Sequence, residues 1–252
     1  MKILDCNLCF GAPINGIPYK SCDSFEKLLE ETDRCGISGG LVRCLYSNTV
    51  GVEYGNRFVS EEIKRLGNPD FKAVWAVLPP FTGETPDPEG LPSRMAENNV
   101  GALYIDPQIH RYPMNRLTLG KIFETAEKRR IPVLLSTALH VSIDSVYKIM
   151  EEYPLLTAVV SDRDCWPNAR RLYPLAATYK NLCLDLSFVM DAGGVEDMTK
   201  RFGAEKLLFG TAFPERSTGS MMAVVRSADI DEKDRALIFG GNLLRLLSEE
   251  KL

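Results

Sequence analysis

A few polar residues end short apolar runs of this sequence, and they are the candidates for chemistry. Cys9, Ser136 and Asp162 each close or follow such a run, and His110 lies in a loop between two of them. A thiol acts as a nucleophile when a neighbouring cation or base lowers its pKa. His110 could be that base for Cys9 or Ser136, which would permit acyl transfer. Cys9 as a small buried residue and His110 as a surface residue remain open alternatives.

Three arginines lie within or after the apolar runs of the sequence. Arg163 stands between Asp162 and Asp164, and this triplet could form an internal ion pair or face a polar ligand. Arg43 belongs to another apolar run and could point to either face of a strand, and Arg216 follows the last run. Two or three arginines near one pocket favour a carboxylate or phosphate ligand. We therefore expect an anion-binding preference.

The elements that must position these residues alternate along the chain. Eight strand-like runs, each followed by a helical pattern, occupy residues 2–8, 41–45, 73–78, 101–105, 132–135, 156–160, 182–186 and 207–209. Strands separated by helices indicate a parallel sheet with right-handed crossovers. Eight such units in one chain of 252 residues predict a single (β/α)8 TIM barrel over residues 1–252. The polar residues would then meet at the carboxyl ends of the strands, with the loops 81–92 and 106–116 around them.

Composition excludes several classes of function. The net charge of −4 and the scattered basic residues argue against nucleic-acid or anionic-membrane partners. No run approaches the ~20 apolar residues of a membrane span. Asp5 interrupts the short apolar start, so we expect no signal peptide. Seven cysteines, an odd number, without an export signal indicate reduced thiols and a cytoplasmic protein.

Motifs in order along almost the whole chain resemble the amidohydrolase-related family (amidohydrolase 2) of metal-dependent hydrolases and decarboxylases on a (β/α)8 barrel. The family's Asp-x-His-x-His is represented by Asp5-Cys6-Asn7-Leu8-Cys9, its Gly-Thr-Asp-x-Pro by Gly210-Thr211-Ala212-Phe213-Pro214, and its closing Gly-Asn-x-x-Arg-Leu-Leu by 241–247. The strand pattern Asn-Val-Tyr-x-Asp-x-Ser is matched by 181–187, and Tyr-Pro pairs at 112–113 and 153–154 agree as well.

The resemblance implies metal ligands at positions that hold other residues here. They correspond to Asn7, Cys9, Ser136 and Asp162, and the aspartate that handles the attacking water corresponds to Ala212. A catalytic zinc needs about three good protein donors and a water, and Asn7 and Ser136 are poor ones. The chain has only two histidines, His110 in a loop and His140 before an expected helix start. We expect no metal and no other cofactor.

Three functional hypotheses remain. The first is an amidohydrolase-like barrel that has lost its metal site, is metal-independent or inactive, and binds a small polar or anionic molecule through Asn7, Ser136, Arg43, Arg163 and Arg216. The second is an active metal-independent hydrolase or lactonase that uses Cys9, His110 or Asp162. The third is a non-catalytic interaction protein. The sequence leaves open whether the chain is an enzyme and whether it forms a homo-oligomer.

Overall fold

Parallel strands form the centre of the molecule. The computed structural model describes residues 1–12, 20–162 and 165–252. Within them one eight-stranded sheet has the strand order of the sequence. The strands are β1 (Leu4–Phe10), β2 (Gly39–Cys44), β3 (Phe71–Ala76), β4 (Val100–Tyr104), β5 (Val133–Ser136), β6 (Ala158–Ser161), β7 (Leu182–Asp185) and β8 (Leu207–Leu208).

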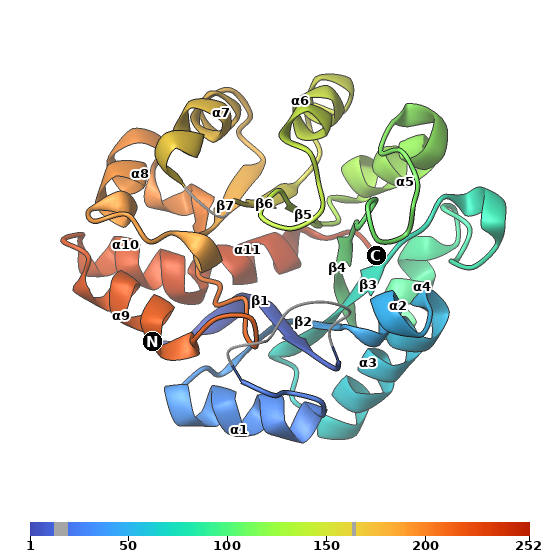
Figure 1. Ribbon diagram of the computed structural model, residues 1–252, viewed down its shortest axis with the longest axis horizontal. Coiled ribbons are helices and arrows are strands. Elements are labelled where there is room, and N and C mark those ends of the chain that lie inside the picture. The colour runs from blue at the N-terminus through green and yellow to red at the C-terminus, as the bar shows by residue number, and fades with distance from the viewer. Residues whose placement is uncertain (13–19, 163–164) are drawn as a thin grey trace.

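Helices follow the strands, and most of them form the outer ring of the molecule, whereas α11 packs against one end of the barrel interior (Figure 1). They are α1 (Phe25–Cys35), α2 (Tyr46–Thr49), α3 (Val52–Leu66), α4 (Leu91–Glu97), α5 (Arg116–Arg129), α6 (Ile143–Glu152), α7 (Cys165–Thr178), α8 (Gly194–Phe202), α9 (Thr218–Ser227), α10 (Glu232–Ala236) and α11 (Asn242–Glu249). Short 3-10 turns are η1 (Pro80–Thr82), η2 (Leu186–Phe188) and η3 (Ala204–Lys206), and η4 (Leu237–Gly241) is a π turn.

The sheet closes on itself between its first strand and the segment at its last. The backbone N–H of Cys6 donates to the carbonyl of Phe209 at 2.9 Å, and that of Cys9 donates to the carbonyl of Phe213 at 2.9 Å. Seven parallel pairings join the other neighbours. The (β/α)8 barrel expected from the alternating pattern is therefore confirmed.

Local signals set the helix boundaries. Ser24 caps α1 by accepting from the N–H of Lys27, and Gly36 ends it in the left-handed region at φ 73°. The helical pattern after the second strand begins at Val52 and forms α3. Val52, Val59 and Ile63 share its buried face, and their spacing of seven and four residues is helical. Among the described residues no helix is both long enough and apolar enough to cross a membrane.

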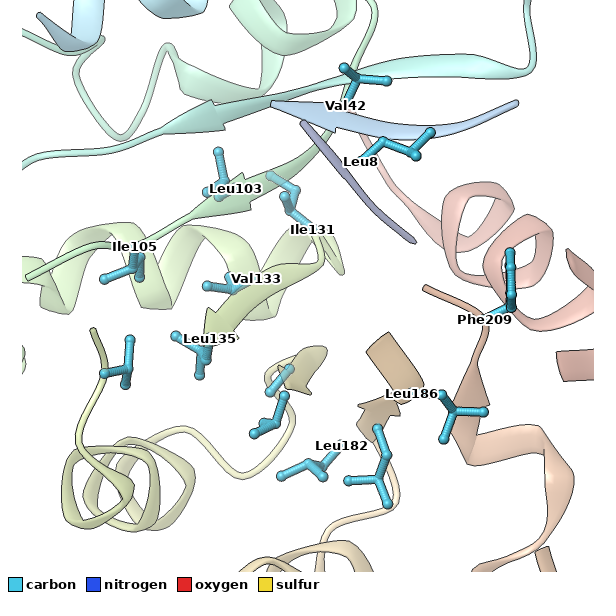
Figure 2. Close-up of a cluster of buried hydrophobic side chains, with 14 of the residues drawn as sticks. Leu8, Val42, Leu103, Ile105, Ile131, Val133, Leu135, Leu182, Leu186 and Phe209 are labelled. Atoms are coloured by element: carbon cyan, nitrogen blue, oxygen red, sulfur yellow. The ribbon is translucent and has the colours of Figure 1, made fainter. Parts of the chain in front are cut away.

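Two apolar layers hold the barrel. The larger layer lies between strands and helices and includes Leu8, Val42, Val133 and Phe209 (Figure 2). The smaller layer fills the barrel itself: Leu4, Cys6, Leu41, Val74, Ala102, Tyr104, Leu134, Val159, Cys183 and Leu208, with Leu243 and Leu246 of α11. Strand residues alternate between the two layers, as the period of two requires. One end of the interior is thus packed with apolar side chains, and polar side chains occupy the other.

Candidate functional site

Polar side chains converge inside the barrel where the strands end. They surround a cavity of about 10 Å³, the space of one water molecule. Its lining residues are Cys6, Asn7, Arg43, Tyr104, Leu134, Ser136, Val159, Ser161 and Asp185. The consecutive residues Cys6 and Asn7 both face inward because the register of β1 shifts between Asp5 and Leu8. Three predicted ligand-binding residues, Asn7, Ser136 and Arg43, therefore meet at one cavity.

Asn7 is held by the end of β7. Its Nδ2 donates to Asp185 Oδ2 at 2.8 Å and to Ser187 Oγ at 3.2 Å. Asp185 Oδ1 also accepts from the backbone N–H of Ser187 at 2.9 Å and from its hydroxyl at 2.6 Å. This network ties β1 to β7. Both hydrogens of the Asn7 amide are donated to acceptors within the protein.

A second buried carboxylate ties β1 to the turn after β8. Asp5 Oδ2 accepts from the Thr211 hydroxyl at 2.6 Å, and Asp5 Oδ1 accepts from the backbone N–H groups of Asn7 at 2.8 Å and Thr211 at 3.1 Å. Burial raises the pKa of Asp5 to about 7, outweighing the hydrogen bonds that lower it. Burial also raises the pKa of Asp185. Two carboxyl groups with raised pKa values thus lie beneath the mouth.

Gly210 allows the turn after β8 to pass close to this network. A Cβ at this position would lie 2.2 Å from Asp185 Oδ1, 2.4 Å from Ser187 Oγ and 3.0 Å from Cys6 Sγ. No side chain fits without displacing these groups. The glycine of the Gly-Thr pair therefore serves close packing against the carboxylate.

Arg43 is a buried cation without an ion-pair partner among the described residues. It is 9% exposed, and its guanidinium lies over the ring of Tyr104, 4.3 Å from the ring centroid. Its Nε is buried and has no hydrogen-bond acceptor in the described part of the chain. Burial acts to lower the pKa of Arg43, but the nearby Tyr104, Cys9, Asp106 and Glu215 raise it overall. Arg43 is therefore charged and incompletely satisfied.

Ser136 also carries a buried polar group that is not satisfied within the described part of the chain. It ends β5 and is 5% exposed. Its Oγ is buried and finds no hydrogen-bond partner among the described residues. Its Cα pairs with that of Ser161, which in turn pairs with Asp185. A hydroxyl donor thus lines the same cavity as the unsatisfied arginine.

Cys9 is buried and does not line the cavity. It is 4% exposed, and its thiol donates to the carbonyl of Phe213 at 3.2 Å. Burial raises the pKa of Cys9, although the charge of Arg43 opposes this. A protonated, hydrogen-bonded thiol fits the small buried residue that the sequence left open as an alternative.

His110 lies apart from the cavity lining. Its Nε2 lies 3.3 Å from the carbonyl oxygen of Ser47, and its Nδ1 is buried with no hydrogen-bond partner among the described residues. The structure therefore places His110 against the loop that contains α2 and does not pair it with Cys9 or Ser136 through any hydrogen bond in the described part of the chain.

Two further predicted residues, Asp162 and Arg216, contact side chains that do not line the cavity. Asp162 is 4% exposed, and its Oδ2 lies 3.8 Å from Arg171 Nη2. Arg216 packs its guanidinium over the ring of Phe188, 4.9 Å from the centroid, and its Nη1 lies 2.7 Å from Met190 Sδ. Arg163 falls outside the described residues. Of the two expected arginines that the structure describes, Arg43 lines the cavity and Arg216 does not.

A carboxylate and an imidazole at the rim did not figure among the predicted site residues. Asp106 directly follows Ile105 after β4 and is fully buried, and its Oδ2 lies 2.9 Å from Nδ1 of His140. The sequence signal for Asp106 was the same as for Asp162, an aspartate directly after a buried run. His140 was expected at the start of α6 and instead reaches back to Asp106 from the loop after β5.

Of the four side chains at the positions that the resemblance assigns to metal ligands, Asn7 and Ser136 are poor donors, and Cys9 and Asp162 are two donors where about three are needed. Asn7 directs amide hydrogens toward Asp185 and Ser187, the thiol of Cys9 donates to the carbonyl of Phe213, and a serine hydroxyl such as that of Ser136 is a weak ligand. Ala212 replaces the aspartate of the Gly-Thr-Asp motif and adopts φ 51°. Across the described ranges no group of three or more His, Cys, Asp or Glu side chains could hold a metal ion.

Comparisons with known proteins agree with this fold. The chain is similar to an uncharacterized TIM-barrel protein of Bordetella bronchiseptica, with 20% identity over 99% of each chain and a TM-score of 0.74. It is similar to a 2,6-dihydroxybenzoate decarboxylase from Rhizobium, with 14% identity over 98% of each chain and a TM-score of 0.69. A 5-carboxyvanillate decarboxylase from Sphingomonas paucimobilis matches with 12% identity, 98% and 99% coverage and a TM-score of 0.68.

Sequence comparison gives the family. No curated protein matches the chain significantly. The sequence model of the family described as Amidohydrolase matches residues 46–248, which is most of the chain and includes β3 to β8. Asn7, Cys9 and Arg43 precede the matched segment. The barrel, its order of motifs and this match together show that the chain belongs to the amidohydrolase family.

Proposed function

We propose that this amidohydrolase-family barrel has lost the family's metal site and binds a small anion at its mouth, with Arg43 as the cation that receives it. The observation that carries the proposal is the buried Arg43 guanidinium, whose Nε has no acceptor among the described residues. Burying a charge without a partner costs several kcal/mol. A cation–π contact such as that with Tyr104 returns about 0.5–2 kcal/mol of this. A carboxylate oxygen would supply the missing acceptor.

Two neighbouring carboxyl groups, those of Asp106 and Asp185, are occupied by other donors. Asp106 interacts with the charge of Arg43, but its oxygens accept from His140, Asn48, Tyr104 and the backbone of Ile109. Asp185 is occupied by Asn7 and Ser187. Ser136 Oγ offers a second donor beside Arg43. The cavity holds one oxygen-sized group, so the rest of the ligand would extend upward toward the rim.

Loss of the metal site rests on donor chemistry. Each position that the family resemblance assigns to a histidine ligand carries an amide, a thiol, a hydroxyl or a carboxylate, and the amide of Asn7 is turned toward Asp185 and Ser187. The protein is then metal-independent or a pseudoenzyme. The second reading, a metal-independent hydrolase or lactonase that uses Cys9, His110 or Asp162, has weaker support because these side chains contact Phe213, Ser47 and Arg171.

The proposal is tested by titrating the protein with acetate and benzoate and with their neutral counterparts acetamide and benzamide, by calorimetry or NMR at low salt. We expect the acids to bind at least tenfold more tightly than the amides. Arg43→Met should abolish this preference, and Arg216→Met, the matched removal of a rim arginine, should retain it. Equal affinity of acids and amides would contradict the proposal, as would one zinc or manganese ion bound per chain at the mouth.

A further inference from the structure

His140 and Asp106 form a hydrogen-bonded pair at the rim of the mouth. The distance from His140 Nδ1 to Asp106 Oδ2 is 2.9 Å. The carboxylate is fully buried, whereas about 30% of the imidazole is exposed. The two residues come from different loops, one after β4 and one after β5, and are 34 positions apart. A buried acceptor thus holds an imidazole whose other edge reaches solvent.

Asp106 is itself fixed by donors on several sides. Its Oδ2 accepts from Asn48 Nδ2 at 3.0 Å and from the Tyr104 hydroxyl at 3.4 Å, and its Oδ1 accepts from the backbone N–H of Ile109 at 3.4 Å. Burial acts to raise the pKa of Asp106, but the hydrogen bond and charge of His140, the backbone N–H of Ile109 and the charge of Arg43 lower it overall. The carboxyl group is therefore an anion and accepts only.

This arrangement fixes the tautomer of His140. Because Asp106 cannot donate, Nδ1 of His140 must carry the hydrogen in their hydrogen bond. In the neutral imidazole Nε2 then has the free lone pair. No described residue forms a hydrogen bond with Nε2. An oriented imidazole with an unoccupied basic nitrogen is the arrangement of a general base.

Tyr104 connects this pair to the anion site. The face of its ring carries the Arg43 guanidinium, and its hydroxyl reaches the oxygen of Asp106 that also holds His140. The charges of Arg43 and Asp106 interact. A molecule anchored on Arg43 and extending out of the one-oxygen cavity would therefore approach the edge of His140.

We propose that His140, positioned by Asp106, is the proton acceptor of the barrel mouth and acts on a carboxylate-bearing molecule anchored on Arg43. This inference rests on the proposed anion site for its ligand and goes beyond it by assigning chemistry to the rim. In the proton transfer, a bond from hydrogen to oxygen of the ligand or of a water beside it breaks and a bond from hydrogen to Nε2 forms. The imidazolium then lies against the Asp106 carboxylate, and the proton returns when the product leaves. Asp106 is a positioning residue.

Each imidazole can be studied alone because the chain has only two histidines. His110→Gln leaves His140 as the single imidazole, and His140→Gln leaves His110. Nitrogen NMR of these variants above pH 8 reports the tautomer of each ring. We expect His140 to be at least 80% protonated at Nδ1. A ring protonated mainly at Nε2 would overturn the inference.

Acylation by diethyl pyrocarbonate, which attacks the unprotonated imidazole nitrogen, gives a second readout. In His110→Gln we expect Asp106→Asn to slow acylation at least threefold, and the exposed Asp144→Asn to leave it unchanged. Acetate at saturating concentration should slow acylation of His140 at least threefold in this background, and Arg43→Met should remove the protection. An acylation rate that ignores Asp106→Asn would also overturn the proposal.

Direct acetate titration separates the two proposals. If acetate binds through Arg43 and fails to protect His140, the proton-acceptor role fails and the anion site stands. If acetate does not bind, the anion site fails, and because the acceptor role needs its anchored ligand, that role fails with it, whatever the tautomer. Circular dichroism of each variant confirms that the barrel is folded.

Discussion

Nδ2 of Asn7 donates a 2.8 Å hydrogen bond to Oδ2 of Asp185, a residue 178 positions further along the chain. The bond joins the first strand of the barrel to the seventh at the floor of the mouth. The family resemblance assigns a metal-binding histidine to the position of Asn7. Here that position holds a donor that satisfies a buried carboxyl group, so the replacement has acquired a structural role.

Asn7→Asp should be strongly destabilising. The new carboxylate would face Asp185 in a buried site, and either the two charges repel or one group must take up a proton. We expect a loss of about 3 kcal/mol in the free energy of unfolding at pH 8, decreasing as the pH falls. Urea denaturation at several pH values measures this. Asn181→Asp, at a half-buried amide that donates to the Pro154 carbonyl, is the matched control and should cost less than about 1 kcal/mol. Equal losses in the two variants would contradict the assignment.

Asp5 should make the stability of the protein depend on pH near neutrality. Its folded-state pKa of about 7 lies above its ordinary value of 3.8, so the folded state binds more protons than the unfolded state between these values. The stability contribution is therefore fully present below pH 3.8 and is lost as the pH rises toward 7. The full shift corresponds to about 4 kcal/mol at most.

The Asp5 contribution is isolated by comparing the wild type with Asp5→Asn between pH 4 and about pH 9. The difference between their unfolding free energies should change in favour of the variant as the pH rises, and then level off above pH 8. Glu31, whose pKa its ion pair with Arg34 lowers to about 2, acts in the opposite sense and loses its contribution below pH 4.5. A difference curve that stays flat across neutrality would show that Asp5 titrates at its ordinary pKa.

Gly210→Ala should disrupt the same network from the side of β8. The added Cβ would lie 2.2 Å from Asp185 Oδ1, so the turn or the carboxylate must move. We expect a destabilisation of about 2–3 kcal/mol in thermal or urea unfolding. The nearest atom to a Cβ at Gly219, a residue of α9, is 3.8 Å away. Gly219→Ala should therefore be neutral or stabilise by up to about 1 kcal/mol. An unchanged free energy of unfolding in Gly210→Ala would show that the turn after β8 can accommodate a Cβ at this position.

The barrel could be predicted from the sequence because each strand is a short apolar run and a helical pattern separates it from the next. The inward position of Arg43 could not, since alternation along β2 permits either face until neighbouring strands fix the register. The inward pair Cys6 and Asn7 also required the register shift in β1. The Asp106–His140 pair joins two loops, and hydrophobic periodicity carries no information about how loops approach one another.

Arg43→Met should stabilise the protein in the absence of an anion and remove its response to one. Methionine fills a similar path with apolar surface, and the cost of a buried, incompletely paired charge disappears. We expect a gain on the order of 1–3 kcal/mol in the free energy of unfolding in buffer without carboxylates. Acetate should raise the melting temperature of the wild type and leave that of Arg43→Met unchanged, since only a ligand bound to the folded state stabilises it. Arg216→Met controls for removal of a mouth arginine and should follow the wild type. If Arg43→Met is less stable than the wild type without acetate, the protein itself supplies the hydrogen-bond acceptors and charges that stabilise the guanidinium. The anion-site proposal would then be wrong.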